Sequence, residues 1–207
     1  MHTLVWIATL VVFVMVAWRL VSQRTALPCP AWLAWMVEMD NPLTSVNRAV
    51  SIIKLLELEP GMKVLDAGCG PGRLTIPLAR AVGEFGGVLA LDLQPEMLDN
   101  VAAKAERECL ENIRYLCAGL GGGHLPGNAF DRATLVTVLG EVVEGERALS
   151  ELFAALKPGG LLVVTEIIFD PHFQTKWMVR ELALHVGFVE KKEVGSWWAF
   201  SLVFEKP

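Results

Sequence analysis

The sequence predicts an α/β fold, and three observations carry this prediction. Short apolar runs alternate with amphipathic segments from residue 44 onward, which is the pattern of parallel strands joined by right-handed helical crossovers. A glycine-rich turn at residues 68–72 follows the first apolar run. The last two runs are joined by a tight turn at Gly195-Ser196, which adds an antiparallel pair. We therefore expect a Rossmann-like, doubly wound, mostly parallel seven-stranded sheet with an antiparallel C-terminal edge.

Local signals place each element of this sheet in chain order. Thr44 or Ser45 is a residue type that caps helices, and Pro60-Gly61 ends the first predicted helix of the domain. Pro95 suits the first turn of a later helix. Strands are expected at residues 63–66, 88–92, 113–117, 132–139, 161–167, 189–194 and 198–204. Helices are expected at residues 45–58, 73–82, 95–109, 147–155 and 175–186.

The N-terminal segment differs in composition from the rest of the chain. All but two of residues 4–21 are apolar or small, and a helix of that length spans about 27 Å, close to the hydrocarbon core of a bilayer. Trp6 and Trp18 lie near its two ends, where interfacial aromatic residues are common. A cleaved signal peptide fits less well, since no Lys or Arg precedes the run. We expect a transmembrane helix, with a packing or oligomerisation helix as the alternative.

This interpretation divides the chain into three parts. Residues 1–27 are the expected membrane anchor, residues 28–43 an interfacial junction, and residues 44–207 the soluble domain. Arg19 and Arg24 lie on the C-terminal side of the apolar run, and the positive-inside rule then places the domain in the cytoplasm. Large apolar side chains recur in the junction at helical spacing, at Trp32, Trp35, Met36 and Met39. They predict a lid over the domain, a helix at the bilayer surface, or both.

Residues 64–72 read Val-Leu-Asp-Ala-Gly-Cys-Gly-Pro-Gly, which is a buried strand running into a glycine-rich turn. The glycine spacing is G-x-G-x-G, whereas the dinucleotide fingerprint is G-x-G-x-x-G and would need glycine where Arg73 stands. Asp92 ends the next apolar run, where an acid can accept hydrogen bonds from ribose hydroxyls. The pattern therefore predicts a nucleoside site in a βαβ unit, and no P-loop sequence is present.

This string closely resembles motif I of the class I S-adenosylmethionine-dependent methyltransferases. The resemblance continues in Asn-Ala-Phe-Asp at 128–131 with the apolar run after it, in Leu-Lys-Pro-Gly-Gly at 156–160, and in Gly187-Phe188 before the closing pair. It covers about residues 44–207. Within the family, the chain is similar to the broad subgroup that includes ubiquinone/menaquinone and phospholipid methyltransferases.

The resemblance implies S-adenosyl-L-methionine as cofactor and places its parts along the carboxyl ends of the strands. The first loop would hold the methionine portion, Asp92 the ribose, and Leu93 with Met97 the adenine. The expected cofactor-binding residues are Asp66, Gly68, Cys69, Gly70, Gly72, Asp92, Leu93, Met97 and Leu139. The chain departs from the family after the third strand, because residues 118–126 contain no acid for the adenine amino group. Backbone amides or His124 are left to hold the adenine.

Two residues near the expected methyl position are candidates for catalysis. His172, after the fifth strand, is a candidate base because its ordinary pKa lies near neutral pH. Glu141, after the fourth strand, would orient a substrate or act as a base. A surface loop and a solvated helix-start acid are the plainer interpretations of these two residues.

Net charge, motifs and cysteine spacing restrict the classes of substrate and partner that the sequence allows. The net charge of −5 and the absence of a [D/N]-P-P-[Y/F] motif argue against nucleic acid as the acceptor. The four cysteines show neither a C-x-x-C pair nor zinc-ligand spacing, so no metal is expected. The sequence thus predicts a membrane-anchored methyltransferase for a lipophilic small molecule, such as a phospholipid amine, a quinone or a hydrophobic thiol. A non-catalytic adaptor that keeps the fold, and a dinucleotide enzyme, are the alternatives.

Overall fold

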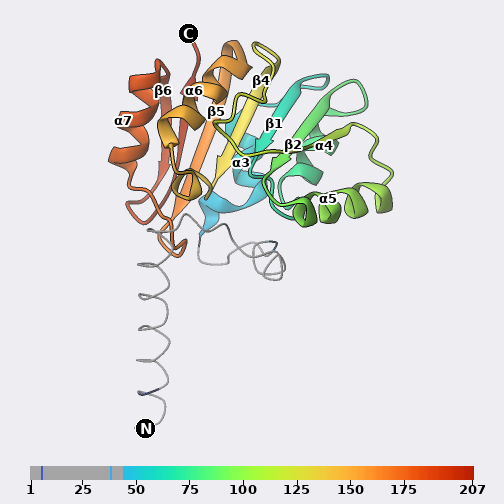
Figure 1. Cartoon of the computed structure of the whole chain (residues 1–207), viewed down its shortest axis with the longest axis horizontal. Helices are drawn as coiled ribbons and strands as arrows, with labels where there is room; N and C mark the ends of the chain where they lie inside the picture. Colours follow the sequence, from blue (N-terminus) through green and yellow to red (C-terminus); the bar gives the residue numbers. More distant parts are fainter. Residues whose placement is uncertain (1–5, 7–37, 39–43) are drawn as a thin grey trace.

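The computed structural model describes residue 6, residue 38 and residues 44–207. Seven strands form one sheet in the order β3-β2-β1-β4-β5-β7-β6 (Figure 1). Strands β1 to β5 are parallel to one another, and β7 runs antiparallel between β5 and β6. The strands are β1 Lys63–Ala67, β2 Gly87–Asp92, β3 Ile113–Cys117, β4 Phe130–Val136, β5 Leu156–Ile167, β6 Val189–Gly195 and β7 Ala199–Glu205. The predicted mixed sheet with an antiparallel edge is confirmed.

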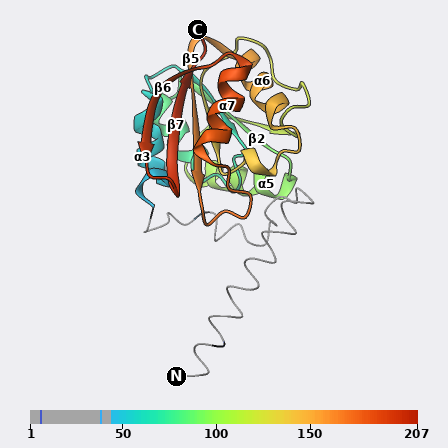
Figure 2. The ribbon, with the colours of Figure 1, turned by 90° about the vertical axis from the view of Figure 1, so that its left-hand side faces the viewer.

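Helices cover both faces of this sheet. They are α3 Ala49–Leu56, α4 Thr75–Val82, α5 Pro95–Arg107, α6 Gly145–Ala155 and α7 Lys176–Val186, with short 3-10 turns η2 Ser45–Asn47 and η3 Leu139–Glu141. Side chains of α3, α4 and α5 belong to one apolar core, and those of α6 and α7 to a second. Figure 2 shows α3 on one side of β6 and β7, with α6 and α7 on the other. The fold is therefore doubly wound, as expected.

Successive side chains of the central strands alternate between the two apolar cores. In β5, Leu162 and Val164 belong to the core under α6 and α7, whereas Leu161 and Val163 belong to the core under α3, α4 and α5. Successive side chains of a strand point to opposite faces, so an apolar run without polar breaks is what a strand covered on both faces requires. This is why the central strands are recognisable in the sequence as short unbroken apolar runs.

Strand β4 ends earlier than the sequence predicts. The run at 132–139 looks continuous, but the strand stops at Val136 because Thr137 adopts a left-handed conformation with φ of +54°. The chain then turns into η3, which begins at Leu139. Leu139 and Glu141 thus lie on a 3-10 turn above the sheet edge. This turn brings the segment after β4 over the glycine-rich loop.

The start of the domain also differs from the prediction. Thr44 makes no capping hydrogen bond, and the predicted single helix is a 3-10 turn followed by α3, with Arg48 extended between them. The cause lies far along the chain. The guanidinium of Arg73 donates to the backbone carbonyl of Asn47 at 2.6 Å and to its side-chain oxygen at 3.0 Å. This contact ties the start of the domain to the end of the glycine-rich loop.

No helix in the described part of the chain is both long enough and apolar enough to cross a membrane. Apart from Trp6 and Glu38, the expected anchor at 1–27 and the expected junction at 28–43 lie outside the described residues.

Candidate cofactor and acceptor site

The glycine-rich loop after β1 is built by backbone contacts. The amide groups of Gly68 and Cys69 both donate to the carbonyl of Leu91, at 2.8 and 2.9 Å, which ties the loop to the end of β2. Gly68 has φ of +70°, and a Cβ atom on it would overlap the side chain of Val138. Gly70 and Gly72 also have positive φ. The loop therefore needs glycine both for its conformation and for its close approach to the segment after β4.

Asp92 lies at the carboxyl end of β2 and holds this loop. Its Oδ2 accepts the amide N–H of Gly70 at 2.8 Å, and its Oδ1 accepts that of Gln94 at 2.9 Å. Burial raises the pKa of the Asp92 carboxyl, while the backbone N–H groups act in the opposite direction. The backbone of Leu93 also hydrogen-bonds to this carboxyl, and a carboxylate has about four lone-pair positions, so acceptor capacity remains for a ribose hydroxyl. The structure thus brings the predicted ribose acid and the second glycine into direct contact.

Asp66 lies beneath the loop rather than at its surface. Its Oδ2 accepts from the Thr75 hydroxyl at 2.6 Å and its Oδ1 from the Thr134 hydroxyl at 2.8 Å. Burial raises the pKa of this carboxyl, and the two threonine hydroxyls lower it. Asp66 therefore joins β1 to α4 and to β4. Its expected action near the cofactor amino group stays a prediction, and sequence reasoning missed both threonine partners.

The expected adenine region lies between the end of β2 and the loop after β3. Leu93 is exposed, and a Cβ atom on Gly119 would stand 3.7 Å from its Cδ1, so the two residues face each other. Met97 is buried in the first turn of α5. Cys69 is also buried, and burial raises the pKa of its thiol, so the site does not hold a thiolate there. The apolar walls suit a flat aromatic ring.

A carboxylate missed by sequence reasoning organises the loop after β3. Glu151 of α6 accepts the backbone N–H groups of Gly121 and Leu125. Residues 118–126 contain no acid, although the family pattern often has one there. The carboxylate of Glu151 reaches the same loop from helix α6. His124 is exposed and lies against Gly122. The loop is therefore shaped by Glu151, a contact with no local signal in the sequence.

The two predicted catalytic residues lie together at the carboxyl ends of β4 and β5. His172 is 5% exposed, and its Nδ1 lies 3.8 Å from an oxygen of Glu141 and 3.9 Å from an oxygen of Asp170. Asp170 also accepts the backbone N–H of His172 at 2.7 Å. A Cβ atom on Gly140 would overlap the carbonyl of His172, so η3 packs directly on this loop. The plainer interpretation of His172 as a surface-loop residue does not agree with its burial.

Glu166, the penultimate residue of β5, completes this cluster. Its Oε2 accepts the backbone N–H of Gln174 at 3.2 Å, and the Gln174 side chain donates to the His172 carbonyl at 3.0 Å. Within the described residues, Glu166 Oε1 and both ring nitrogens of His172 are buried without a hydrogen-bond partner. Burial raises the pKa of Glu166 well above its ordinary value, and nearby Asp170 and Glu141 raise it further. Buried polar atoms without a partner are uncommon, so they mark this cluster as a candidate functional site.

Replacing Glu166 with glutamine should remove a pH dependence of stability. An acid with a raised pKa in the folded state binds its proton more tightly there than in the unfolded chain. Folding stability therefore falls as pH rises from about the ordinary value of 4.5 through the raised pKa. Thermal unfolding of the wild type and Glu166→Gln across this range should show the variant gaining relative stability as pH increases. A constant difference between the two proteins would contradict a buried protonated Glu166.

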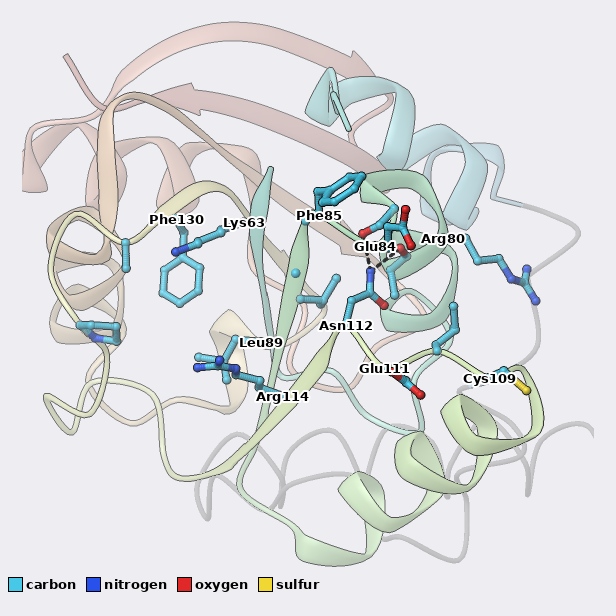
Figure 3. A pocket seen from close by; sticks show the side chains of 18 residues that line it. Lys63, Arg80, Glu84, Phe85, Leu89, Cys109, Glu111, Asn112, Arg114 and Phe130 are labelled. Carbon is cyan, nitrogen blue, oxygen red and sulfur yellow. Dashed lines mark hydrogen bonds between the residues drawn. The ribbon is translucent and has the colours of Figure 1, made fainter. Parts of the chain in front are cut away.

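A hollow also lies at the opposite edge of the sheet. It measures about 820 Å³ and is lined by the amino ends of the parallel strands, including Lys63, Val88 and Phe130 (Figure 3). Asn112 closes part of it by donating to the carbonyls of Ala79 and Gly83, both at 2.8 Å. No predicted site residue lines this hollow. Ligands of open α/β sheets bind at the carboxyl edge, so we assign the site to that edge instead.

The residues at the carboxyl edge fit S-adenosylmethionine. The three glycines of the loop at 68–72 add no side chains of their own, so its backbone can come close to a ligand, and Gly68 packs directly against the Val138 side chain. Asp92 offers lone pairs toward the ribose, and Leu93 with Gly119 offers apolar walls. The buried cluster of Glu166 and His172 then lies on the β4–β5 side, where an acceptor would meet the methyl group.

Comparison with known proteins shows that the chain is similar to methyltransferases. Residues 64–160 match the family model described as a methyltransferase domain. The ubiquinone/menaquinone biosynthesis C-methyltransferase of Vibrio vulnificus is 38% identical over 117 residues, which are 54% of this chain and 45% of that protein. The tRNA (adenine(58)-N(1))-methyltransferase of Thermus thermophilus is 39% identical over 120 residues, which are 56% of this chain and 44% of that protein. The chain thus spans less than half the length of these relatives.

The fold comparison extends over more of the chain. The structure of an S-adenosylmethionine-dependent methyltransferase from Aquifex aeolicus superimposes with a TM-score of 0.76, and covers 87% of this chain and 100% of that one at 23% identity. The sheet order and the antiparallel edge described above are therefore those of a known methyltransferase fold. Motif, sheet and relatives together identify residues 64–160 as a methyltransferase domain with the class I S-adenosylmethionine-dependent methyltransferase fold, similar in sequence to the ubiquinone/menaquinone C-methyltransferases.

Proposed function

We propose that this protein is a membrane-anchored methyltransferase, with its domain on the cytoplasmic face, that methylates a lipophilic acceptor. The apolar run at residues 4–21 and the arginines after it support the anchor and its orientation. The observation that carries the chemistry is His172, which is buried between two carboxylates at the carboxyl edge of the sheet. A base in that position serves an acceptor that must lose a proton. A quinol ring is an acceptor of this kind. The relative from Vibrio vulnificus is named as a ubiquinone/menaquinone biosynthesis C-methyltransferase.

The residues of the site hold the two reactants and transfer one proton in this reaction. S-adenosylmethionine supplies a methyl group that is already activated on a sulfonium sulfur. The chain holds the two reactants in line, which is the main requirement of such a transfer. His172 takes the phenolic proton of the acceptor on a ring nitrogen, and Glu141 with Asp170 stabilises the imidazolium that forms. Glu166 and Gln174 keep the His172 loop in place.

The protons and bonds of this step balance without an oxidant or reductant. Removal of the phenolic proton increases electron density on the ring carbon, which forms a carbon–carbon bond to the methyl group as the carbon–sulfur bond breaks. The ring carbon then loses its own proton, the aromatic ring is restored, and the oxygen regains a proton from His172. The net products are the methylated acceptor, S-adenosylhomocysteine and one proton.

Replacing His172 with glutamine tests its role in proton transfer. Loss of a general base typically lowers the rate about 10²- to 10⁴-fold, and we expect kcat to fall within this range while the Kd for S-adenosylhomocysteine stays unchanged. His185 is a matched control, because it is an exposed histidine in the last turn of α7, paired with Glu146 of α6. His185→Gln should keep the wild-type rate. Equal rates for His172→Gln and the wild type would show that the base is another group.

The acceptor class is tested by transfer of a labelled methyl group. The full chain in detergent is supplied with labelled S-adenosylmethionine and, in parallel, a demethylated isoprenoid quinol or phosphatidylethanolamine. Label in the quinol supports the proposal, and label in the phospholipid amine alone rejects the quinol in favour of an amine. Tight binding of the cofactor with no transfer to either compound or to a membrane lipid extract would favour the adaptor alternative.

A further inference from the structure

Six large apolar side chains near the site are exposed. In the described chain, Val143 is 84% exposed, Trp197 72% and Trp177 67%, and these are large side chains with much to gain from leaving water. Scattered exposed apolar residues are common, but tryptophan is a costly residue to leave in water. We call this set the apolar rim; its members are Leu93, Val143, Phe169, Trp177, Met178 and Trp197.

The topology places the whole apolar rim at one edge of the sheet. Leu93 follows β2, Val143 follows η3, and Phe169 follows β5, all at carboxyl ends. Helix α7 begins beside Phe169, so its first turn, with Trp177 and Met178, lies at the same edge. The β6–β7 turn joins them, because the Ile168 N–H donates to the carbonyl of Trp198 at 2.7 Å. The apolar rim therefore lies in the segments at the carboxyl edge, where the acceptor would enter.

The N-terminal part of the chain reaches the domain at this same edge. The first segment of the described domain (blue) lies at the end opposite the C-terminus (Figure 1), and a Cβ atom on Gly195, in the β6–β7 turn, would stand 3.0 Å from Val46. Glu38 lies 2.6 Å from the Lys104 ammonium, which also donates to the carbonyl of Pro71 in the glycine-rich loop. Thr44, through which the N-terminal segment is joined to the domain, thus lies near the carboxyl edge. If the apolar run at 4–21 is anchored in lipid, the apolar rim faces the bilayer.

The charges near the apolar rim indicate what kind of surface it meets. Lys176, in the first turn of α7, is paired with Glu193, and Arg180 with Glu190 at 2.5 Å and with Glu193 at 2.8 Å. These cations are already neutralised, so they do not form a patch for acidic headgroups. Tryptophan prefers the boundary between lipid and water, where its ring is apolar and its N–H is hydrated. The chemistry fits a bilayer surface of neutral lipid.

We infer that the apolar rim inserts into the bilayer interface, so that a lipid-soluble acceptor passes from the membrane into the site without crossing water. This inference rests on the proposed anchoring and adds the orientation of the domain. Insertion by apolar contact requires no anionic lipid and is little affected by salt. Trp197 and Trp177 enter the headgroup region, and the opposite edge, where Phe85 lies 88% exposed, stays in water.

A site-specific fluorescent probe tests this orientation in the full chain. Cys29, Cys109 and Cys117 are replaced by serine, the buried Cys69 is kept, and one cysteine is introduced by Trp197→Cys, Trp177→Cys or the control Phe85→Cys. Each protein carries an environment-sensitive dye and is reconstituted in phosphatidylcholine vesicles. The dye at 197 and 177 should shift to the blue and lose most of its emission when brominated lipid is included. The dye at 85 should do neither.

Three outcomes decide the inference. Equal behaviour of all three positions, in protein that floats with the vesicles and binds S-adenosylhomocysteine, overturns the rim insertion while leaving the anchor and the cofactor site intact. Protein that binds the cofactor but does not float with the vesicles overturns the proposed anchoring, and the rim inference with it. A blue shift at 197 and 177 that disappears when fewer chains are present per vesicle would mean a second copy covers the apolar rim, which also overturns insertion.

Discussion

Asp92→Ala should lower the affinity for S-adenosylmethionine by at least about 100-fold. The Asp92 carboxylate holds Gly70 and Gln94 by their amide groups and keeps acceptor capacity for a ribose hydroxyl. Hydrogen bonds to a charged group contribute about 1.5–3 kcal/mol each, and loss of those to the ribose and to Gly70 accounts for roughly two orders of magnitude or more. Calorimetric titration of S-adenosylmethionine and S-adenosylhomocysteine into the full chain in detergent measures the change.

A matched control separates this effect from a general loss of charge. Asp99 lies on α5, seven residues beyond Asp92, and is exposed. Asp99→Ala should bind both ligands as the wild type does. Asp92→Asn keeps the size of the side chain and one oxygen acceptor, so it should fall between the wild type and alanine. An unchanged affinity of Asp92→Ala, in protein with a cooperative thermal transition, would reject the ribose assignment.

Gly68→Ala should both destabilise the domain and abolish cofactor binding. The residue has φ of +70°, and the added Cβ would overlap Val138. The left-handed conformation costs a non-glycine residue about 1–2 kcal/mol, and overpacking adds about 1–3 kcal/mol. The expected decrease in Tm is therefore roughly 5–15 °C for a domain of this size. The loop must move to relieve the overlap, so its backbone groups no longer fit the ligand.

Two further variants isolate the overlap from the conformational cost. Gly61 has φ of +88° with no atom near an added Cβ, so Gly61→Ala should show only the conformational cost and bind the cofactor normally. Val138→Ala removes the atoms that the new methyl group would overlap. The double variant Gly68→Ala/Val138→Ala should therefore recover part of the lost stability. Equal decreases in Tm for Gly61→Ala and Gly68→Ala would show that the close approach of Gly68 to Val138 does not contribute to the loss of stability.

The strands and the cofactor loop are predictable because their signals are local. An unbroken apolar run is what a strand covered on both faces requires, and β1, β2 and β3 begin and end within one or two residues of the predicted positions. The glycines at 68, 70 and 72 precede a helix, and an acid follows the next strand, so the nucleoside site is visible in the order of residues. The end of β4 was not predictable, because the left-handed Thr137 has no mark in the apolar run.

The sequence by itself determined the fold class, the cofactor and the list of candidate residues, because strand periodicity and glycine spacing are properties of neighbouring residues. Only the tertiary structure decided which side chains meet. It joined Asp66 to Thr134, 68 residues away, Glu151 to the loop after β3, and Glu141 to His172. Such contacts form where parallel strands end at one edge, and their partners come from different crossovers with no fixed spacing. The buried state of Glu166 and His172, which makes them chemically distinct, is likewise a product of packing.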